Sequence, residues 1–115
     1  MQLLVVDDDL HIRRLVGIYL REAGYEVTEA ASGEEALRAS HAQPFDVVLI
    51  DLILPQYGGF RLCEKLKALP QPPRVVITTG DDSPQSRERA MEAKADAFLP
   101  KPFTREDLLA AIVSP

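Results

Sequence analysis

Several features that mark particular classes of protein are missing from this sequence. A single cysteine, Cys63, stands among 115 residues, which excludes an internal disulfide framework. No apolar run approaches the roughly 18 residues that span a bilayer, and no charged-then-apolar leader opens the chain. We therefore expect a protein of the reducing cytoplasm, with no membrane partner.

Concentrated positive charge is also missing. The chain carries 18 acidic and 13 basic residues, a net charge of −5. Proteins that bind the phosphate backbone of nucleic acids normally present a basic face, and no such cluster of lysine and arginine occurs here. We expect no direct nucleic-acid binding by this chain, an expectation that does not extend to a neighbouring domain.

What is present suits one small domain with its own core. Hydrophobic residues make up 46 % of the 115, enough for a single core without metal or disulfide support. Short apolar runs predict five strands, at 3–6, 25–30, 45–50, 75–77 and 97–99. Amphipathic stretches predict helices at 10–23, from 33 onward, at 60–69, from 84 onward and at 104–113. Strict alternation of strand and helix predicts an α/β sandwich of three layers around a parallel sheet.

Cap residues mark the expected helix boundaries. Ser32 with Glu35 forms the pattern of a capping box, and Ser83 and Thr104 are placed to cap the last two helices. Gly24 follows the first helix, where a residue with positive φ is favoured. Cys63 falls in a helical apolar pattern and is predicted to be a core thiol.

The polar residues at the strand ends carry the chemistry, because ligand sites in such sheets lie beyond the carboxyl ends of the strands. The residues in question are Asp7, Asp8, Asp9, Asp51, Thr78, Thr79 and Lys101. Crowded carboxylates repel unless a cation lies among them, and oxygen ligands suit Mg²⁺ or Mn²⁺ rather than Zn²⁺. A carboxylate beside such an ion, with an ammonium and a hydroxyl nearby, suits phosphoryl transfer to an aspartate.

These residues also carry a family resemblance that covers essentially the whole chain. The sequence resembles the receiver domain of two-component response regulators at four stretches, in order and at the family's spacing: 4–9, 51–55 with Gly59, 79–80 and 101–103. The resemblance implies a flavodoxin-like strand order, 2-1-3-4-5. It also implies a single receiver domain over residues 1–115. The early end of the last helix favours a domain excised from a longer protein with a C-terminal effector domain, with a stand-alone regulator as the alternative.

The resemblance implies a role for each site residue. Asp51 matches the phosphoacceptor, and Asp7 and Asp8 match the acidic pair that holds Mg²⁺, with Mn²⁺ as a substitute. Asp51 and the backbone carbonyl of Ile53 would complete the protein ligands of the metal. Lys101 matches the lysine that pairs with the phosphoryl group, and its bond to the following proline is expected to be cis.

Two further positions match the family's switch. Thr79 corresponds to the hydroxyl that is drawn to the phosphoryl group. Phe98 corresponds to an aromatic residue that turns inward on activation, although a plain core role stays open for it. Asp81 and Ile53 lie where the family tunes loss of the phosphoryl group, which leaves the lifetime of the signal open. For Asp9 we favour a helix cap over a role in the site.

We expect the domain to accept a phosphoryl group from a histidine kinase or a phosphotransfer protein. The expected response is a change in the surface of the fourth helix, fifth strand and fifth helix, which would control an output domain or partner, with phosphorylation-linked homodimerisation as a further expectation. Such a domain catalyses only its own phosphorylation and dephosphorylation, so it is not expected to be an enzyme in the ordinary sense.

Two rival functions are compatible with parts of the pattern. Asp7 and Asp9 form the Asp-x-Asp of a Mg²⁺-dependent phosphohydrolase of the haloacid dehalogenase type, with Asp7 as nucleophile. However, His11 stands where those enzymes have threonine or valine, and the chain has no room for a cap. The second rival is a receiver-like interaction module that is never phosphorylated. The complete set of acidic residues, Thr79 and Lys101 argues against that module.

Overall fold

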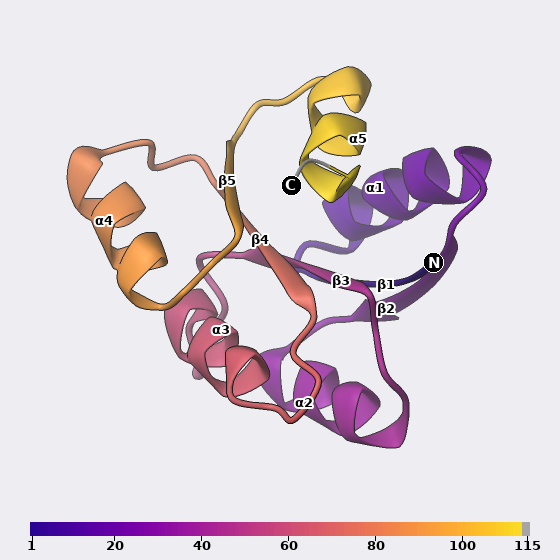
Figure 1. The fold of residues 1–115 in the computed structure, drawn as a ribbon. Helices are drawn as coiled ribbons and strands as arrows, with labels where there is room; N and C mark the ends of the chain where they lie inside the picture. The colour runs from indigo at the N-terminus through magenta and orange to yellow at the C-terminus, as the bar shows by residue number, and fades with distance from the viewer. Residues whose placement is uncertain (114–115) are drawn as a thin grey trace.

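A computed structural model describes residues 1–113, in which five strands alternate with five helices (Figure 1). The strands are β1 (Gln2–Val6), β2 (Glu26–Ala30), β3 (Val47–Asp51), β4 (Arg74–Thr79) and β5 (Ala97–Pro100). The helices are α1 (Leu10–Glu22), α2 (Gly33–Ala42), α3 (Gly59–Lys67), α4 (Pro84–Glu92) and α5 (Arg105–Val113). The predicted alternation is confirmed. None of these helices has both the length and the apolar character needed to cross a bilayer.

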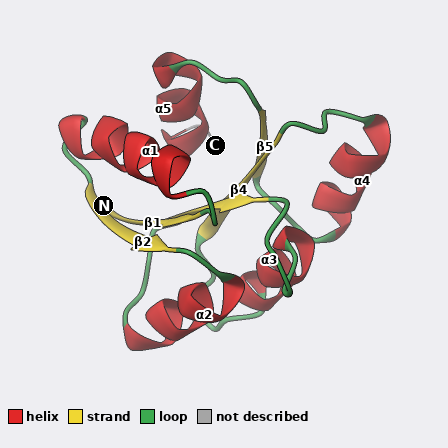
Figure 2. Cartoon of the chain, turned by 180° about the vertical axis from the view of Figure 1, so that it is seen from behind, coloured by secondary structure: helices red, strands yellow, loops and turns green. Residues whose placement is uncertain are grey.

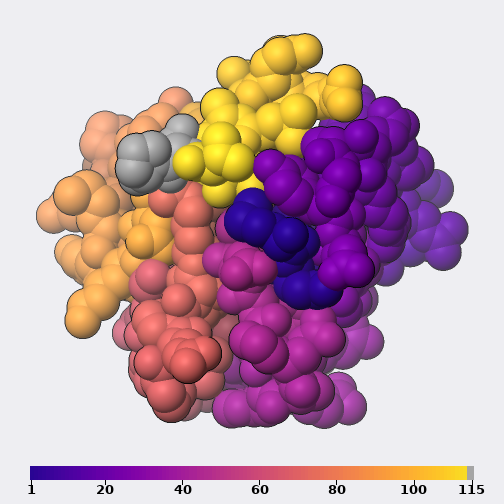
Figure 3. Space-filling view, turned by 45° about the vertical axis from the view of Figure 1, so that its right-hand side comes forward, coloured from indigo at the N-terminus to yellow at the C-terminus, as the bar shows by residue number. Residues whose placement is uncertain are grey.

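All strand pairs are parallel, and the order across the sheet is β2-β1-β3-β4-β5, as the resemblance implied. Helices α1 and α5 cover one face, and α2, α3 and α4 cover the other (Figures 1 and 2). In the space-filling view, α5 in yellow lies against α1 in purple along one side (Figure 3). The fold is therefore the predicted three-layer sandwich.

The two faces of the sheet have separate apolar cores because strand side chains alternate between them. In β1, Leu4 and Val6 pack with the core beneath α2, α3 and α4, whereas Leu3 and Val5 pack with the core beneath α1 and α5. All four side chains are buried. A central strand covered on both faces has no polar side, which explains the unbroken apolar run at the start of the chain.

The predicted caps are present. The Ser32 hydroxyl accepts a hydrogen bond from the Glu35 N–H at 3.2 Å, and the Ser83 hydroxyl accepts one from the Ser86 N–H at 3.2 Å. Thr104 and Asp107 form a reciprocal capping box at the start of α5, a pairing the sequence analysis did not name. The helix starts are thus specified locally, by side chains that accept hydrogen bonds from backbone N–H groups without a partner in the helix.

The predicted core position of Cys63 is confirmed. Its side chain is fully buried on α3, and its S–H group donates to the carbonyl of Ala93, the C-cap residue of α4, at 3.3 Å. Burial is the main reason that the pKa of Cys63 rises to about 11. The thiol therefore joins two helices and stays protonated at neutral pH.

Two strand boundaries differ from the prediction by two residues, and the others agree to within one residue. Strand β3 begins at Val47 rather than at Phe45, because Phe45 packs into the core without pairing in the ladder. Strand β4 continues past the apolar run to Thr79, because the ladder pairs Thr78 with Asp51 and Thr79 with Pro100. Hydrogen bonding to neighbouring strands thus extends β4 into polar residues that an apolar pattern does not mark.

Gly59 fixes the turn that leaves β3. Its N–H donates to the Leu52 carbonyl at 2.9 Å, and a Cβ at this position would lie 2.7 Å from the Leu52 Cα and 2.8 Å from the Asp51 carbonyl oxygen. Both neighbours are backbone atoms, which cannot move aside as a flexible side chain can. Only glycine lets the start of α3 approach the end of β3 so closely.

We expect Gly59→Ala to destabilise the protein by about 1–3 kcal/mol, the usual cost of forcing a methyl group into a filled space. Urea unfolding followed by circular dichroism measures the change. Gly80→Ala is the matched control, because a Cβ there meets nothing within 4 Å and should change stability by less than about 0.5 kcal/mol. Equal stabilities for the two variants would contradict the close approach at Gly59.

Candidate functional site

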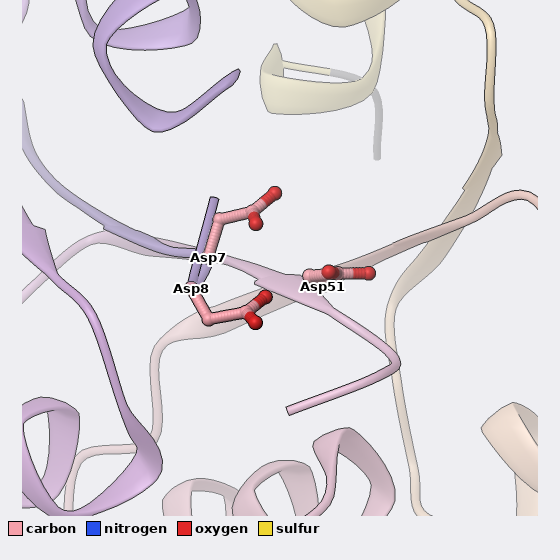
Figure 4. Close-up of side chains that lie close together, drawn as sticks. All are labelled: Asp7, Asp8 and Asp51. Carbon is pink, nitrogen blue, oxygen red and sulfur yellow. The ribbon is translucent and has the colours of Figure 1, made fainter. Parts of the chain in front are cut away.

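Three carboxylates meet at the carboxyl edge of the sheet. The side chains of Asp7, Asp8 and Asp51 each offer an oxygen within 4.8 Å of the others (Figure 4). Strands β1 and β3 are neighbours, and Val6 pairs with Ile50, so the residues that follow them are brought together by the register of the ladder. The predicted convergence of these three acids is confirmed.

Asp7 is the buried member of the cluster, with only 4 % of its surface exposed. One oxygen accepts a hydrogen bond from the Asp9 N–H at 2.9 Å, and the other lies 3.4 Å from the Lys101 ammonium. Asp8 is exposed beside it. The acidic pair therefore has one carboxylate fixed by the protein and one that faces solvent.

Lys101 brings positive charge to the cluster from the far end of the chain. Its Nζ lies 3.4 Å from Asp7 and 3.5 Å from Asp51, and its side chain is 22 % exposed. The Lys101 N–H donates to the Thr79 carbonyl at 2.7 Å, which holds the loop after β5 against β4. The bond from Lys101 to Pro102 is cis, as the resemblance implied.

The pKa of Asp51 is raised above its ordinary value of 3.8. Burial is the largest cause and the charge of Asp7 adds to it, whereas the Lys101 ammonium and the Ile53 N–H act in the opposite direction. The Ile53 N–H lies 3.4 Å from the Asp51 carboxylate. Without a cation, the site thus holds Asp51 in its ionised form at a cost in free energy.

The donor set fits a hard divalent cation. Three carboxylates lie near one ammonium, so the cluster has a net negative charge. Its possible side-chain ligands are all oxygen atoms. Such a set suits Mg²⁺ or Mn²⁺, which take oxygen ligands and retain water. Ile53 contacts Asp51 through its N–H. The role of its backbone carbonyl as a further metal ligand stays a prediction.

Thr79 lies at the same edge of the sheet, but its hydroxyl is bonded to the loop that follows β4. It is buried, and its hydroxyl accepts a hydrogen bond from the Asp81 N–H at 3.0 Å. Thr78, the residue paired with Asp51, donates its own hydroxyl to the Ile50 carbonyl at 3.4 Å. Thr79 thus connects the edge of the site with the start of the segment that leads into α4.

Phe98 packs in part against the core beneath α3 and α4, and the guanidinium of Arg87 lies 4.7 Å from the centre of its ring. This arrangement is compatible with both expectations for Phe98, a core residue and a residue that changes orientation. Its switching role stays a prediction.

Asp9 does cap α1, as the sequence analysis favoured. Its carboxylate accepts hydrogen bonds from the N–H groups of His11 at 2.9 Å and Ile12 at 3.1 Å. A carboxylate used in this way satisfies two backbone donors that would otherwise lack partners. The second aspartate of the Asp-x-Asp pattern is therefore committed to the helix.

Arg13 and Glu29 near the site were not predicted from the sequence: Arg13 on α1 forms a partly buried ion pair with Glu29 on β2 at 3.2 Å. Asp81 was expected near the site, but not the hydrogen bond that its carboxylate accepts from the Ser86 hydroxyl at 2.6 Å. The helical period places Arg13 at the border of the apolar face of α1 and Arg14 on the opposite side, which agrees with their burial. The period does not identify Glu29 as the partner of Arg13, because that pairing depends on how α1 packs against β2.

Comparisons with known proteins agree with the geometry. A family model described as the response regulator receiver domain matches residues 3–113. The response regulator MprA of Mycolicibacterium vanbaalenii is 36 % identical over 110 residues, which cover 96 % of this chain and 48 % of that protein. This chain thus spans about half the length of the curated relatives it matches.

Solved structures give the same result. The chemotaxis protein CheY4 of Vibrio cholerae superimposes with a TM-score of 0.93 at 34 % identity, covering 96 % of this chain and 94 % of that one. A response regulator from Burkholderia pseudomallei, solved with a phosphorylated aspartic acid, a calcium ion and citrate, gives a TM-score of 0.91 at 31 % identity. That match covers 98 % of this chain and 66 % of the other.

The raised pKa of Asp51 predicts the behaviour of a neutral variant. An acid whose pKa is raised by folding destabilises the fold at pH values above that pKa, and the cost vanishes as the pH falls through it toward the ordinary value. Asp51→Asn should therefore raise the free energy of unfolding at about pH 7 in EDTA, with a gain that shrinks toward about pH 4.

Urea unfolding of both proteins across this pH range measures the gain. Added Mg²⁺ should reduce the difference, because it stabilises the wild type by binding to its folded state. An Asp51→Asn variant that is less stable than wild type at neutral pH without metal would contradict the inference that the ionised carboxylate of Asp51 destabilises the folded state.

Proposed function

The chain belongs to the response regulator receiver family, and from that membership we propose that Asp51 accepts a phosphoryl group in a Mg²⁺-dependent reaction. The donor is the phosphohistidine of a sensor histidine kinase or of a phosphotransfer protein. The observation that carries the proposal is the position of Asp51, with the Lys101 ammonium 3.5 Å away and two further carboxylates within 4.8 Å.

Each group has a task in the transfer. A carboxylate oxygen of Asp51 forms a bond to phosphorus, the bond from phosphorus to the imidazole nitrogen breaks, and the imidazole leaves with the electron pair. Asp7 and Asp8 would hold Mg²⁺, which when bound supplies positive charge to the phosphoryl oxygens. Lys101 already contacts Asp7 and Asp51, so its ammonium is placed to pair with another of those oxygens.

The switch starts from the hydroxyl of Thr79. That hydroxyl is now engaged by the Asp81 N–H, and the Asp81 carboxylate accepts hydrogen bonds from the Ser83 N–H at 3.0 Å and the Ser86 hydroxyl at 2.6 Å. When Thr79 turns to bond a phosphoryl oxygen, this chain of bonds transmits the change to the first turn of α4. The phosphoryl group thereby shifts a two-state equilibrium.

Helix α4 is suited to respond. Among its own residues only Ser86 and Ala90 are buried, and the side chain of Met91 is 76 % exposed. Its connection to β5 includes the stacking of Arg87 on Phe98. An element with so little apolar burial moves at low cost, so we assign the output to the surface of α4, β5 and α5.

The output domain or partner that recognises this surface is not part of this chain. In a protein of the length of MprA, the domain would control a second domain in the same polypeptide; in a protein of the length of CheY4, it would control a separate partner. The first arrangement is the one we propose, and phosphorylation-linked pairing of two copies through α4, β5 and α5 is part of the proposal. The setting is the cytoplasm, where such kinases present their phosphohistidine.

Incubation with acetyl phosphate and Mg²⁺ should add one phosphoryl group, visible by intact mass as an acid-stable and base-labile adduct. Asp51→Asn should abolish the adduct, because the nucleophile is lost. Asp9→Asn is the matched control and should retain it, since asparagine caps a helix as well as aspartate does.

The other outcomes of this experiment point to the rival functions. A label on Asp7 would indicate a phosphohydrolase of the haloacid dehalogenase type. The absence of any label, from small donors and from a phosphorylated kinase alike, would indicate an interaction module that is never phosphorylated.

Lys101→Ala should leave phosphorylation of Asp51 possible and weaken the conformational response, because the ammonium pairs with the phosphoryl group after transfer. Beryllofluoride, which mimics the phosphoryl group, allows the response to be titrated by amide chemical shifts of α4. A response of unchanged amplitude and midpoint in Lys101→Ala would count against this role.

A further inference from the structure

Arg13, the fourth residue of α1, contacts the backbone of the acidic cluster. Its side chain is only 13 % exposed, which is unusual for an arginine. Its Nη1 donates to the backbone carbonyl of Asp7 at 2.7 Å, and its Nε donates to the Glu29 carboxylate at 3.2 Å. The guanidinium thus links the loop that carries the acidic pair to the end of β2.

Strand β2 holds Asp7 at two points. The Asp7 N–H donates to the Ala30 carbonyl at 3.2 Å, and Glu29, the preceding residue, orients Arg13 toward the Asp7 carbonyl. Glu29 also pairs with Arg21 at 3.4 Å. The N–H and the carbonyl of Asp7 are both fixed by β2, one directly and the other through a guanidinium.

The carbonyl that Arg13 holds belongs to the peptide bond between Asp7 and Asp8. Fixing the carbonyl oxygen fixes the plane of that peptide, and the plane sets the direction in which the Cα of Asp8 presents its side chain. Because Asp8 is exposed, neighbouring side chains do not enclose it. The placement of its carboxylate near Asp7 and Asp51 therefore depends on the backbone.

We propose that Arg13, oriented by Glu29, is a positioning residue for a divalent cation at Asp7, Asp8 and Asp51. It acts through the peptide between Asp7 and Asp8 and does not touch the ion. The inference rests on the proposed function in one respect, that this cluster takes Mg²⁺. It adds a requirement outside the cluster: a cationic side chain that favours cation binding by geometry.

Charge and geometry predict opposite effects, which makes the proposal testable. A guanidinium bonded to the Asp7 carbonyl repels a cation that approaches Asp7, so its removal should tighten cation binding if charge alone matters. If Arg13 acts by positioning, its removal should weaken binding although a positive charge has been lost. The sign of the change distinguishes the two.

Two variants and one control carry the test. Arg13→Met removes the charge and both hydrogen bonds, whereas Arg13→Lys keeps the charge but replaces the planar fork with a single ammonium. Arg21→Met is the matched control, because Arg21 also pairs with Glu29 but donates to the Val27 carbonyl instead of Asp7. Circular dichroism and urea unfolding establish that each variant is folded.

Mn²⁺ binding, measured by the paramagnetic resonance of the free ion, should weaken about tenfold in Arg13→Met, as is usual for groups that orient metal ligands. Arg13→Lys should also weaken it, at unchanged charge, and Arg21→Met should leave it within about twofold of wild type. In Arg13→Met, the Mg²⁺ concentration for half-maximal phosphorylation should rise in parallel. In metal-free Arg13→Met, the Asp8 amide should exchange its hydrogen faster.

Equal or tighter Mn²⁺ binding by Arg13→Met would overturn the inference, as would an equal loss in Arg21→Met, which would reflect general loosening of α1 against β2. A wild-type protein that binds no Mn²⁺ or Mg²⁺ would overturn the proposed function and this inference with it. Unchanged affinity in the variants of a metal-binding wild type overturns the inference alone.

Discussion

The register of the parallel strands is the constraint on which the rest of this structure depends. It brings the ends of β1, β3, β4 and β5 to one edge, so that Asp7 and Lys101, 94 residues apart in the chain, are within 3.4 Å of each other. The apolar cores on both faces fix that register, because a shift by one residue would turn every strand side chain to the wrong face. The charged cluster is therefore held together by apolar packing elsewhere, against the mutual repulsion of its own carboxylates.

The sequence predicted those parts of the fold that depend on local patterns. Apolar runs marked the strands, and side chains such as Ser32 and Thr104 marked the helix starts, because each acts on backbone groups within a few residues. The acids and Lys101 were predictable because they lie at the last residue of a strand or within two residues after it. Arg13 and Glu29 were not, since their pairing depends on how α1 is rotated against β2, and the last residues of β4 were not, since they pair through the ladder without an apolar pattern.

The two helices that follow the site differ in how they are attached. Helix α3 is anchored by buried apolar side chains and by the close approach at Gly59, so it serves as a fixed wall. Helix α4 is attached largely through polar and cationic groups, including Ser86 at its start and Arg87 above Phe98. Apolar packing is non-directional and tolerates little rearrangement, whereas a few directional bonds can be exchanged for others at similar free energy. The contrast separates a rigidly packed part of the domain from a helix that is held by exchangeable bonds.

The Thr79 hydroxyl accepts a hydrogen bond from the Asp81 N–H, and under the proposed function this bond has a further consequence. One rotor cannot occupy two orientations, so the bonds that hold the resting loop set a threshold that phosphorylation must exceed. Asp81, Ser83 and Ser86 contribute to that threshold without belonging to the acidic cluster. Under the proposed function, substitution of Ser83 or Ser86 would alter how readily this loop rearranges without changing the groups that contact Asp51. Under that proposal, the sensitivity of the switch and the reactivity of Asp51 would depend on different residues.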